Sequence, residues 1–156
     1  MELTYGDVVR AVSSMGELLQ LRPAPTIGIA VKVARNARKL QVVANDFNDA
    51  RNAVVETLRE QFTQTWEDED GKEQTGVPES SEAAFEAKAT EEINELLLEP
   101  VDVDVRVISI ADLEACEVKR KDFEVPSGTL FELWFMFGLD EPEDPVVGSI
   151  PIAEAA

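Results

Sequence analysis

Carboxylates are the residues of this chain whose number and spacing could do chemistry. The segment WEDEDGKEQTG, Trp66 to Gly76, places five acidic residues around a single Asp-Gly pair. Further along the chain, Asp102 and Asp104 lie two residues apart in VDVDVRVISI. The first group is a candidate metal site, and the second is a candidate pair for general acid and base catalysis.

The acidic segment does not have the spacing of a calcium-binding loop. An EF-hand loop places ligands at positions one, three and five, glycine at six and glutamate at twelve. With Gly71 at position six, Trp66 falls at position one and Val77 at position twelve, and neither side chain coordinates calcium. Only Asp68 and Asp70 fall at ligand positions, so the segment indicates weak adventitious cation binding at most.

The same segment is typical of a tight β-turn. Asp70 and Gly71 are residue types that tolerate the positive φ angles of a type I′ turn. Residues 64–66 lead into this turn and residues 73–75 lead out of it. We therefore predict a short β-ribbon closed by a two-residue turn.

No catalytic partner accompanies Asp102 and Asp104. The sequence has no histidine, no glycine-rich phosphate loop, no Gly-x-Ser-x-Gly and no cysteine pair for zinc, and its one thiol, Cys116, lacks a partner base. A metal site made of carboxylates alone is compatible with the composition, but no spacing selects one. We predict a protein that is not an enzyme, with no cofactor and no catalytic or metal-binding residue. Asp102 and Asp104 are then solvated strand-face residues, and Cys116 is a small, semi-buried hydrophobe.

Charge and length set further limits. The 156 residues suit one domain, and the net charge of −18 divides into +1 for residues 1–66, −10 for residues 67–99 and −9 for residues 100–156. A polyanion is repelled by nucleic acid and by anionic lipid, so the charge disfavours direct nucleic-acid binding. Without an apolar run of about 20 residues, a secretory signal or a cysteine pair, we expect a cytosolic protein that binds no membrane. The basic cluster Lys32, Arg35, Arg38 and Lys39 is interpreted as a solvated or ion-paired helix face.

The first hundred residues have strong helical periodicity. Thr4 followed by Asp7 is an N-cap signal for a helix that reaches Leu21, after which residues 26–29 alternate like a brief strand. From about residue 30 to residue 66 an apolar stripe continues without Pro or Gly, which predicts a helix of about 37 residues and about 55 Å. A glutamate-rich helix over residues 80–99 should fold back along it. The predicted hairpin covers residues 29–99, with its tip at 66–78, and Arg51 should pair with a glutamate of the acidic helix.

The C-terminal third predicts a strand, a short helix and an arm. Residues 101–110 alternate valine with polar residues, which is typical of a strand, and its partner is residues 27–29, residues 116–118 or a second copy of the chain. Residues 130–137, LFELWFMF, predict a helix that is apolar nearly all round, and that either sinks into the core or lends one face to a partner. Residues 139–156 are rich in proline and acidic residues. This pattern favours an extended arm.

These elements predict a mainly α fold with a small β component, in the α+β class. It consists of a short N-terminal helix, a long antiparallel helical hairpin with a β-turn tip, one amphipathic strand and a short aromatic helix. Residues 1–138 form one domain, and residues 139–156 form the arm.

The order of these elements resembles a family of short uncharacterised proteins encoded in tailed-phage and prophage genomes. The residues that carry the resemblance are Leu3-Thr4, residues 25–39, the NELL segment at 94–97, residues 101–107 and residues 110–114. The aromatic helix and the arm depart from the family pattern, whose members finish soon after the segment at 110–114. The resemblance implies a viral context and transfers no catalytic residue.

We therefore expect a non-catalytic phage protein that acts through protein–protein contacts, as a minor virion component or assembly partner that self-associates. The alternative is an acidic inhibitor of a host defence protein, either a nucleic-acid mimic or a sequestering protein. Either protein would be found in the cytoplasm of the infected host, and the first would also be incorporated in the virion. The residues expected to contact a partner are Val101, Val103 and Val105 of the strand, Phe131, Trp134 and Phe135 of the aromatic helix, and Val146, Val147, Ile150 and Ile152 of the arm.

Overall fold

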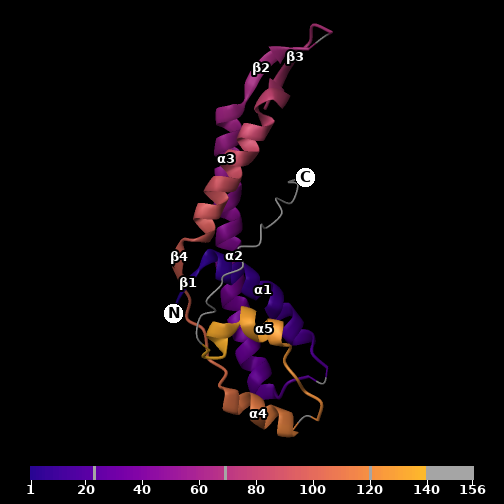
Figure 1. The fold of residues 1–156 in the computed structure, drawn as a ribbon, viewed down its shortest axis with the longest axis vertical. Coiled ribbons are helices and arrows are strands. Elements are labelled where there is room, and N and C mark those ends of the chain that lie inside the picture. Colours follow the sequence, from indigo (N-terminus) through magenta and orange to yellow (C-terminus); the bar gives the residue numbers. More distant parts are fainter. Residues whose placement is uncertain (23, 69, 120, 140–156) are drawn as a thin grey trace.

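One long helix, α2 (Ile27–Phe62), runs through the molecule and joins two regions of different construction (Figure 1). This computed structural model describes residues 1–139 except residues 23, 69 and 120. We call residues 1–47 and 99–139 the body, and residues 48–98, which project from it, the stalk. The fold is mainly α with two small antiparallel sheets, as the sequence predicts.

Helix α1 (Tyr5–Gln20) begins at the predicted N-cap. The Asp7 backbone N–H donates to Thr4 Oγ1 at 3.1 Å, and the Thr4 N–H donates to Asp7 Oδ2 at 2.9 Å. These two bonds form a capping box, which satisfies N–H groups that the first helical turn leaves without partners. The helix packs against the first half of α2 and supplies much of the core.

Helix α2 starts earlier than the sequence pattern indicates. The Ala30 N–H donates to the Thr26 carbonyl at 2.9 Å, so residues 27–29 form the first helical turn and the strand prediction for them is wrong. Four alternating residues fit a strand, but Ile29 also lies four residues before Val33, and both are buried on one helix face. The helix then continues without a break for 36 residues, about 54 Å, which confirms the long uninterrupted helix.

The stalk confirms the predicted helical hairpin. Strands β2 (Gln64–Glu67) and β3 (Glu73–Gly76) pair in antiparallel fashion, and α3 (Glu79–Leu97) returns along the distal half of α2 (Figure 1). The prediction of a two-residue turn is wrong. The Asp68 N–H donates to the Lys72 carbonyl and the Gly71 N–H donates to the Asp68 carbonyl, both at 2.9 Å, so the loop contains three residues. Gly71 has a φ of 74°, which suits the left-handed position of a three-residue hairpin loop.

The ion pair predicted for Arg51 is also wrong. The Arg51 guanidinium donates only a long 3.4 Å hydrogen bond to the neighbouring Asn52 amide oxygen, and no ion pair joins it to α3 among the described residues. A half-buried arginine can keep its charged end in water by extending along the helix surface. Arg51, which interrupts the apolar stripe, therefore does not hold the two helices of the hairpin together.

The second sheet pairs β1 (Glu2–Thr4) with β4 (Pro100–Asp102), with Leu3 opposite Val101. This corrects the predicted partners, because residues 27–29 and 116–118 are helical and no second copy is needed. The three residues of β1 end at the N-cap of α1 and are too few to reveal a period of two, so β1 cannot be predicted from its sequence. Both outer edges are blunted, since Pro100 has no N–H and the Thr4 N–H is held by Asp7.

The remainder of the predicted strand, residues 103–109, is not paired with a strand. It lies on α2, where the buried side chain of Asn36 takes the role of a neighbouring strand. Asn36 Nδ2 donates to the Arg106 carbonyl at 2.8 Å, and Asn36 Oδ1 accepts from the Arg106 N–H at 2.9 Å. Asn36 is 0% exposed, and these two bonds satisfy both ends of its amide.

Two lysines flank Asn36 and complete the attachment of this segment. Lys39 Nζ donates to the Asp104 carbonyl at 2.6 Å and forms an ion pair with the Asp104 carboxylate. Lys32 Nζ lies 2.8 Å from Asp112 Oδ2 and 3.4 Å from the Val107 carbonyl oxygen. Spacings of four and three put all three side chains on one face of α2. We call Lys32, Asn36 and Lys39 the polar ladder; its two lysines confirm the ion-paired interpretation of the basic cluster.

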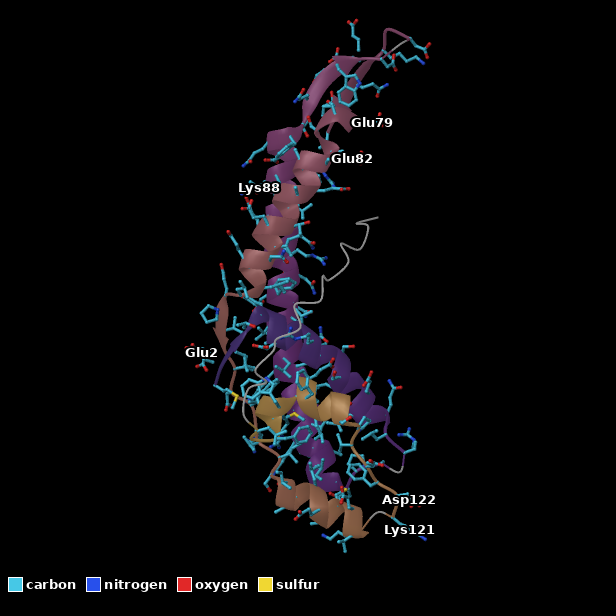
Figure 2. The ribbon with its side chains drawn as sticks, in the orientation of Figure 1. Glu2, Glu79, Glu82, Lys88, Lys121 and Asp122 are labelled. Carbon is cyan, nitrogen blue, oxygen red and sulfur yellow. The ribbon has the colours of Figure 1, made fainter. Side chains whose placement is uncertain are left out.

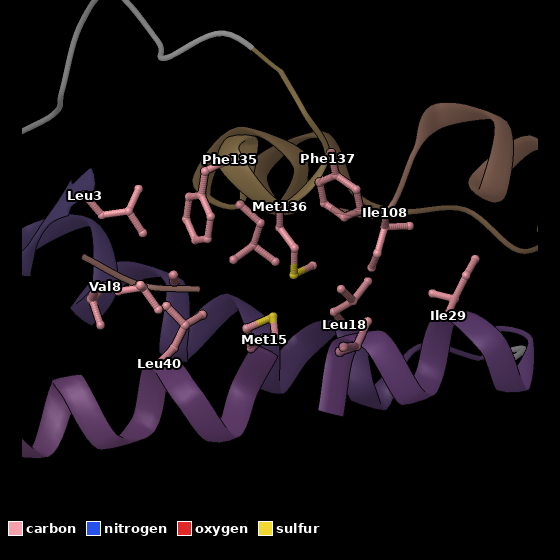
Figure 3. Close-up of a cluster of buried hydrophobic side chains, with 14 of the residues drawn as sticks. Leu3, Val8, Met15, Leu18, Ile29, Leu40, Ile108, Phe135, Met136 and Phe137 are labelled. Atoms are coloured by element: carbon pink, nitrogen blue, oxygen red, sulfur yellow. The ribbon is translucent and has the colours of Figure 1, made fainter. Parts of the chain in front are cut away.

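The core lies between α1, the first half of α2 and the C-terminal segments (Figure 3). Helix α5 (Ser127–Glu132) and the short 3-10 helix η1 (Trp134–Met136) form its lid, in place of the single helix predicted for residues 130–137. The Ile108 N–H donates to the Met136 carbonyl at 2.8 Å, which ties the segment on α2 to η1. The most deeply buried apolar side chains are those of Val8, Ala11, Val33, Leu40, Ile108, Leu133, Phe135 and Met136.

Candidate partner-binding surfaces

The predicted contact residues of the strand are mostly covered by the chain itself. Val103 is 3% exposed and belongs to the core, so it presents no surface to another chain. Val101 and Val105 are half-buried and pack against the same core. The reason is the pairing with β1 and the attachment to α2, which together cover the face that the sequence left open.

The aromatic segment is divided between the core and the surface. Phe135 is 0% exposed and therefore cannot serve as a contact in this structure, whereas Phe131 is 48% exposed. Trp134 is half-buried and stacks edge-on against Phe135 with ring centroids 5.8 Å apart. Of the two alternatives for this segment, burial in the core describes residues 133 and 135–137. The four predicted contacts of the arm, Val146, Val147, Ile150 and Ile152, lie outside the described residues.

Asp102 and Asp104, the candidate carboxylate pair, have structural partners. Asp102 Oδ1 lies 2.7 Å from the N-terminal ammonium, and Asp104 pairs with Lys39 of the polar ladder. The hydrogen bond from Lys39 holds the pKa of the Asp104 carboxyl below its ordinary value of 3.8. Similarly, the hydrogen bond from Lys32 lowers the pKa of Asp112. Both carboxylates therefore remain charged at neutral pH and attach the extended segment to α2.

A small cleft lies between the start of α2 and α4 (Ile110–Lys119). Its volume is about 150 Å³, and its lining includes Thr26, Lys32 and Cys116. The Cys116 thiol is 1% exposed and accepts a hydrogen bond from the Thr26 N–H at 3.3 Å. The cleft is smaller than the 300–1,000 Å³ of usual ligand pockets. The Cys116 thiol is fully buried, whereas the sequence predicts a semi-buried side chain.

The stalk concentrates negative charge. Residues 48–98 contain 14 acidic and 4 basic residues, whereas the body, residues 1–47 and 99–139, contains 13 acidic and 10 basic residues. Acidic side chains extend into solvent along the stalk, with Glu79 and Glu82 on α3 as examples (Figure 2). Lys88 is the one lysine of α3, and it is bound to Glu91 at 2.9 Å and Glu92 at 3.6 Å.

The stalk buries little apolar surface. Leu58, Ala89 and Ile93 are its buried apolar residues, against 18 in the body, counted over the described residues. Phe62 and Phe85 add an edge-to-face ring pair with centroids 5.9 Å apart where the helices meet the ribbon. A two-helix layer has no third element to cover its outer faces, and most of α3 is exposed.

The stalk joins the body through a close approach of α1 and α3. Within the body, beside this approach, the Tyr5 ring lies 5.7 Å from the Phe47 ring, and the Tyr5 N–H donates to the Glu99 carbonyl at 3.1 Å. A Cβ on Gly6 would lie 3.2 Å from the Leu97 carbonyl oxygen, so a residue without a side chain permits this contact. The base of the stalk therefore lies against α1, whereas its far end lies away from the body in the part of the chain that the structure describes (Figure 1).

The β2–β3 ribbon forms the end of the stalk. Every residue of β2 is exposed, and Trp66 is 39% exposed although tryptophan is highly buried on average. Glu67 lies directly opposite Glu73, and Thr65 lies opposite Thr75 with their hydroxyls 3.2 Å apart. The alternation of strand side chains puts these two pairs on one face and Trp66 on the other.

The Asp68 carboxylate is fully used within the turn. Its Oδ1 accepts from the Asp70 N–H at 3.0 Å and the Lys72 N–H at 2.8 Å, and its Oδ2 accepts from the Gln74 amide at 2.9 Å. The Lys72 bond is the main reason why the pKa of Asp68 is below its ordinary value. The sequence pattern does not reveal this role of Asp68 or the exposure of Trp66, because it indicates only that Trp66 leads into a turn.

The three comparisons with known proteins add no relative. Neither the known protein-family models nor the curated proteins nor the solved structures contain a match to this chain. The resemblance to short phage proteins thus stays a prediction. Among residues 1–139 with the three gaps noted above, no helix combines the length and the apolar character needed to cross a bilayer.

Proposed function

We propose that this chain is a non-catalytic protein that acts through contacts with other protein chains, as a minor component or assembly partner of a phage particle. The observation that carries the proposal is the stalk. It extends the molecule far beyond its core, yet it buries only three apolar residues. Such an element contributes little to the stability of the chain, so a role in contact explains its length better than a role in folding.

The surface of the body supports the same proposal. Large apolar side chains stay exposed where α2 begins and along α4, namely Ile27 at 79%, Ile110 at 54% and Val118 at 88%. Exposed apolar side chains mark a site that another chain covers where they form one contiguous patch, and the proposal is that these three do. Self-association through the body is compatible with the charge, whereas stalks of two copies repel each other.

Two measurements test the proposal. Light scattering of the purified protein should give an oligomer, and mass spectrometry of purified phage particles should detect the chain with the structural proteins. A variant with Ile27→Glu and Val118→Glu should lower the oligomer mass, while Glu86→Gln and Glu95→Gln on the stalk should not. A monomeric protein that is absent from the particles would contradict the proposed function.

The second candidate is an acidic inhibitor of a host defence protein. The observation that favours it is the excess of ten negative charges on the stalk, which lies apart from the more balanced body. A rod of carboxylates can occupy a basic groove that normally holds a nucleic-acid backbone. Affinity purification from host lysate separates the two candidates: a nuclease or DNA-binding protein released by salt favours the inhibitor, and viral structural proteins favour the first.

A further inference from the structure

We propose that the β2–β3 ribbon is the contact element of the stalk, and that it inserts into a cationic groove, lined by arginine and lysine, on a partner protein. This inference rests on the proposed function, because it names the partner chemistry for a chain that acts by contact. It is carried by the construction of the ribbon, while the charge of the stalk sets the class of partner.

The first observation is that the ribbon does not serve the fold. A two-stranded hairpin is at best marginally stable alone, and three further residues of this one, Glu73, Gln74 and Thr75, are exposed as completely as β2. None of its side chains belongs to the core. A helical hairpin could be closed by a short loop, so a separate ribbon at its end requires another explanation.

The second observation is the pair Glu67 and Glu73. Like charges directly opposite each other weaken an antiparallel ribbon, and here they lie on a face where no described lysine or arginine forms an ion pair with them. A partner that supplies cations to this face converts a destabilising pair into a binding site. The neighbouring Thr65 and Thr75 hydroxyls present two further polar groups beside the carboxylates.

The third observation is Trp66 on the opposite face. Its ring edge passes over Gly76, with Cη2 3.9 Å from the position that a Cβ would occupy there, and 39% of the residue remains exposed. Tryptophan is the best aromatic surface for a guanidinium or ammonium group, and it is enriched among residues that dominate binding energies. A partner must therefore contact both faces of the ribbon, which a groove does and a flat surface does not.

The charge of the stalk decides the class of partner. Nucleic acid and anionic membranes are repelled by ten excess negative charges, and a second copy of the stalk is repelled equally. The remaining class with complementary charge is a protein surface rich in lysine and arginine. The Asp68 carboxylate is held by its own turn and fixes the ribbon in shape before the partner arrives.

The test uses the full chain and a fluorescein-labelled deca-arginine peptide at about 0.15 M ionic strength, where weak long-range attraction is largely screened. Fluorescence anisotropy should show saturable binding. The Trp66→Ala variant and the Glu67→Gln/Glu73→Gln variant should each weaken it about tenfold. The control Glu86→Gln/Glu95→Gln removes the same charge from α3 and should change the affinity less than threefold. Circular dichroism checks that every variant keeps its helices.

Three results with the peptide would overturn the inference: no saturable binding, an equal loss in the control, or an unchanged affinity in Trp66→Ala. Equal losses would mean that the peptide is attracted by the whole polyanion. Binding of a single-stranded DNA oligonucleotide by the same ribbon would also overturn it. A result for the peptide is independent of whether the chain is found in phage particles, so failure of the proposed function is seen in mass spectrometry and failure of this inference in anisotropy.

Discussion

The body and the stalk share one helix but are stabilised in different ways. In the body, α2 is covered by α1, by the segment on the polar ladder and by η1, and its inward residues lose contact with water. In the stalk, the same helix has α3 as its partner and keeps much of its surface exposed. The comparison teaches that helix length alone does not indicate where a helix is stable. The stability of each part of the helix depends on how much of its surface is packed against other elements.

The largest expected effect comes from one substitution made in both regions. Leu40 in the body and Leu58 in the stalk are both leucines of α2 with at most 2% exposure. Leu40→Ala should lower the free energy of unfolding by about 3 kcal/mol, because it leaves a cavity in a close-packed core. Leu58→Ala should lower it by about 2 kcal/mol, the low end for this substitution, because a two-helix layer can collapse around the gap. Urea denaturation followed by circular dichroism measures both, and equal losses would abolish the distinction.

The next effect tests the polar ladder. Asn36→Ala removes both partners of the Arg106 backbone, whose two hydrogen bonds are part-buried, and leaving polar groups unpaired in such a place costs about 1–3 kcal/mol. We expect a loss of about 2 kcal/mol in urea denaturation. The matched control is Asn45→Ala, on the same helix, where the exposed amide oxygen accepts only from Gln41 at 3.0 Å. Its effect should stay within about 0.5 kcal/mol. A neutral Asn36→Ala would show that the segment does not depend on α2.

A smaller effect concerns the joint between the regions. Alanine is favoured over glycine within a helix by up to about 1 kcal/mol, so Gly16→Ala, where a Cβ meets no atom within 4 Å, should raise the stability of α1. Gly6→Ala should lose this gain and lower stability by about 0.5 kcal/mol, because its Cβ would approach the Leu97 carbonyl of α3 at 3.2 Å. Thermal denaturation of the two variants gives the signs. If Gly6→Ala is stabilised instead, α1 and α3 can move apart at this contact without cost.

The smallest effect is the dependence of the ladder on pH. The pKa values of Asp104 and Asp112 lie below 3.8 in the folded chain, so their ion pairs contribute fully above that pH and are lost as the pH falls through the lowered values. Carboxyl NMR titration should show Asp104 returning toward 3.8 in Lys39→Met and Asp112 in Lys32→Met. If each aspartate keeps its low pKa without its lysine, another group must hold it charged.

Periodicity predicted the elements that repeat a pattern many times. The 36 residues of α2 and the apolar face of α3 give enough repeats to locate both helices and their hairpin, and Thr4 with Asp7 marks the start of α1 correctly. Short elements gave too few repeats. Residues 26–29 alternate by chance, and β1 has three residues, so its pairing with β4 could not be found from the sequence.

The candidate surfaces were harder to predict than the helices. Val103 and Phe135 have the apolar character of contact residues, but the same character directs side chains to a core, and only the fold decides between the two. Asn36 was hidden among basic residues because one buried amide leaves no periodic pattern. Trp66 was visible in the sequence, but its exposure depends on the ribbon lying beyond the reach of any other element.

The absence of Gly and Pro between residues 29 and 66 of the chain has a mechanical consequence. A continuous α-helix has no hinge at the point where the body ends, so a push or a twist applied to the ribbon travels along the backbone of α2 as it would along a lever. The half of α2 within the body carries the polar ladder, which holds the extended segment in place. A load at one end of the molecule is thus felt about 50 Å away, inside its best-packed part.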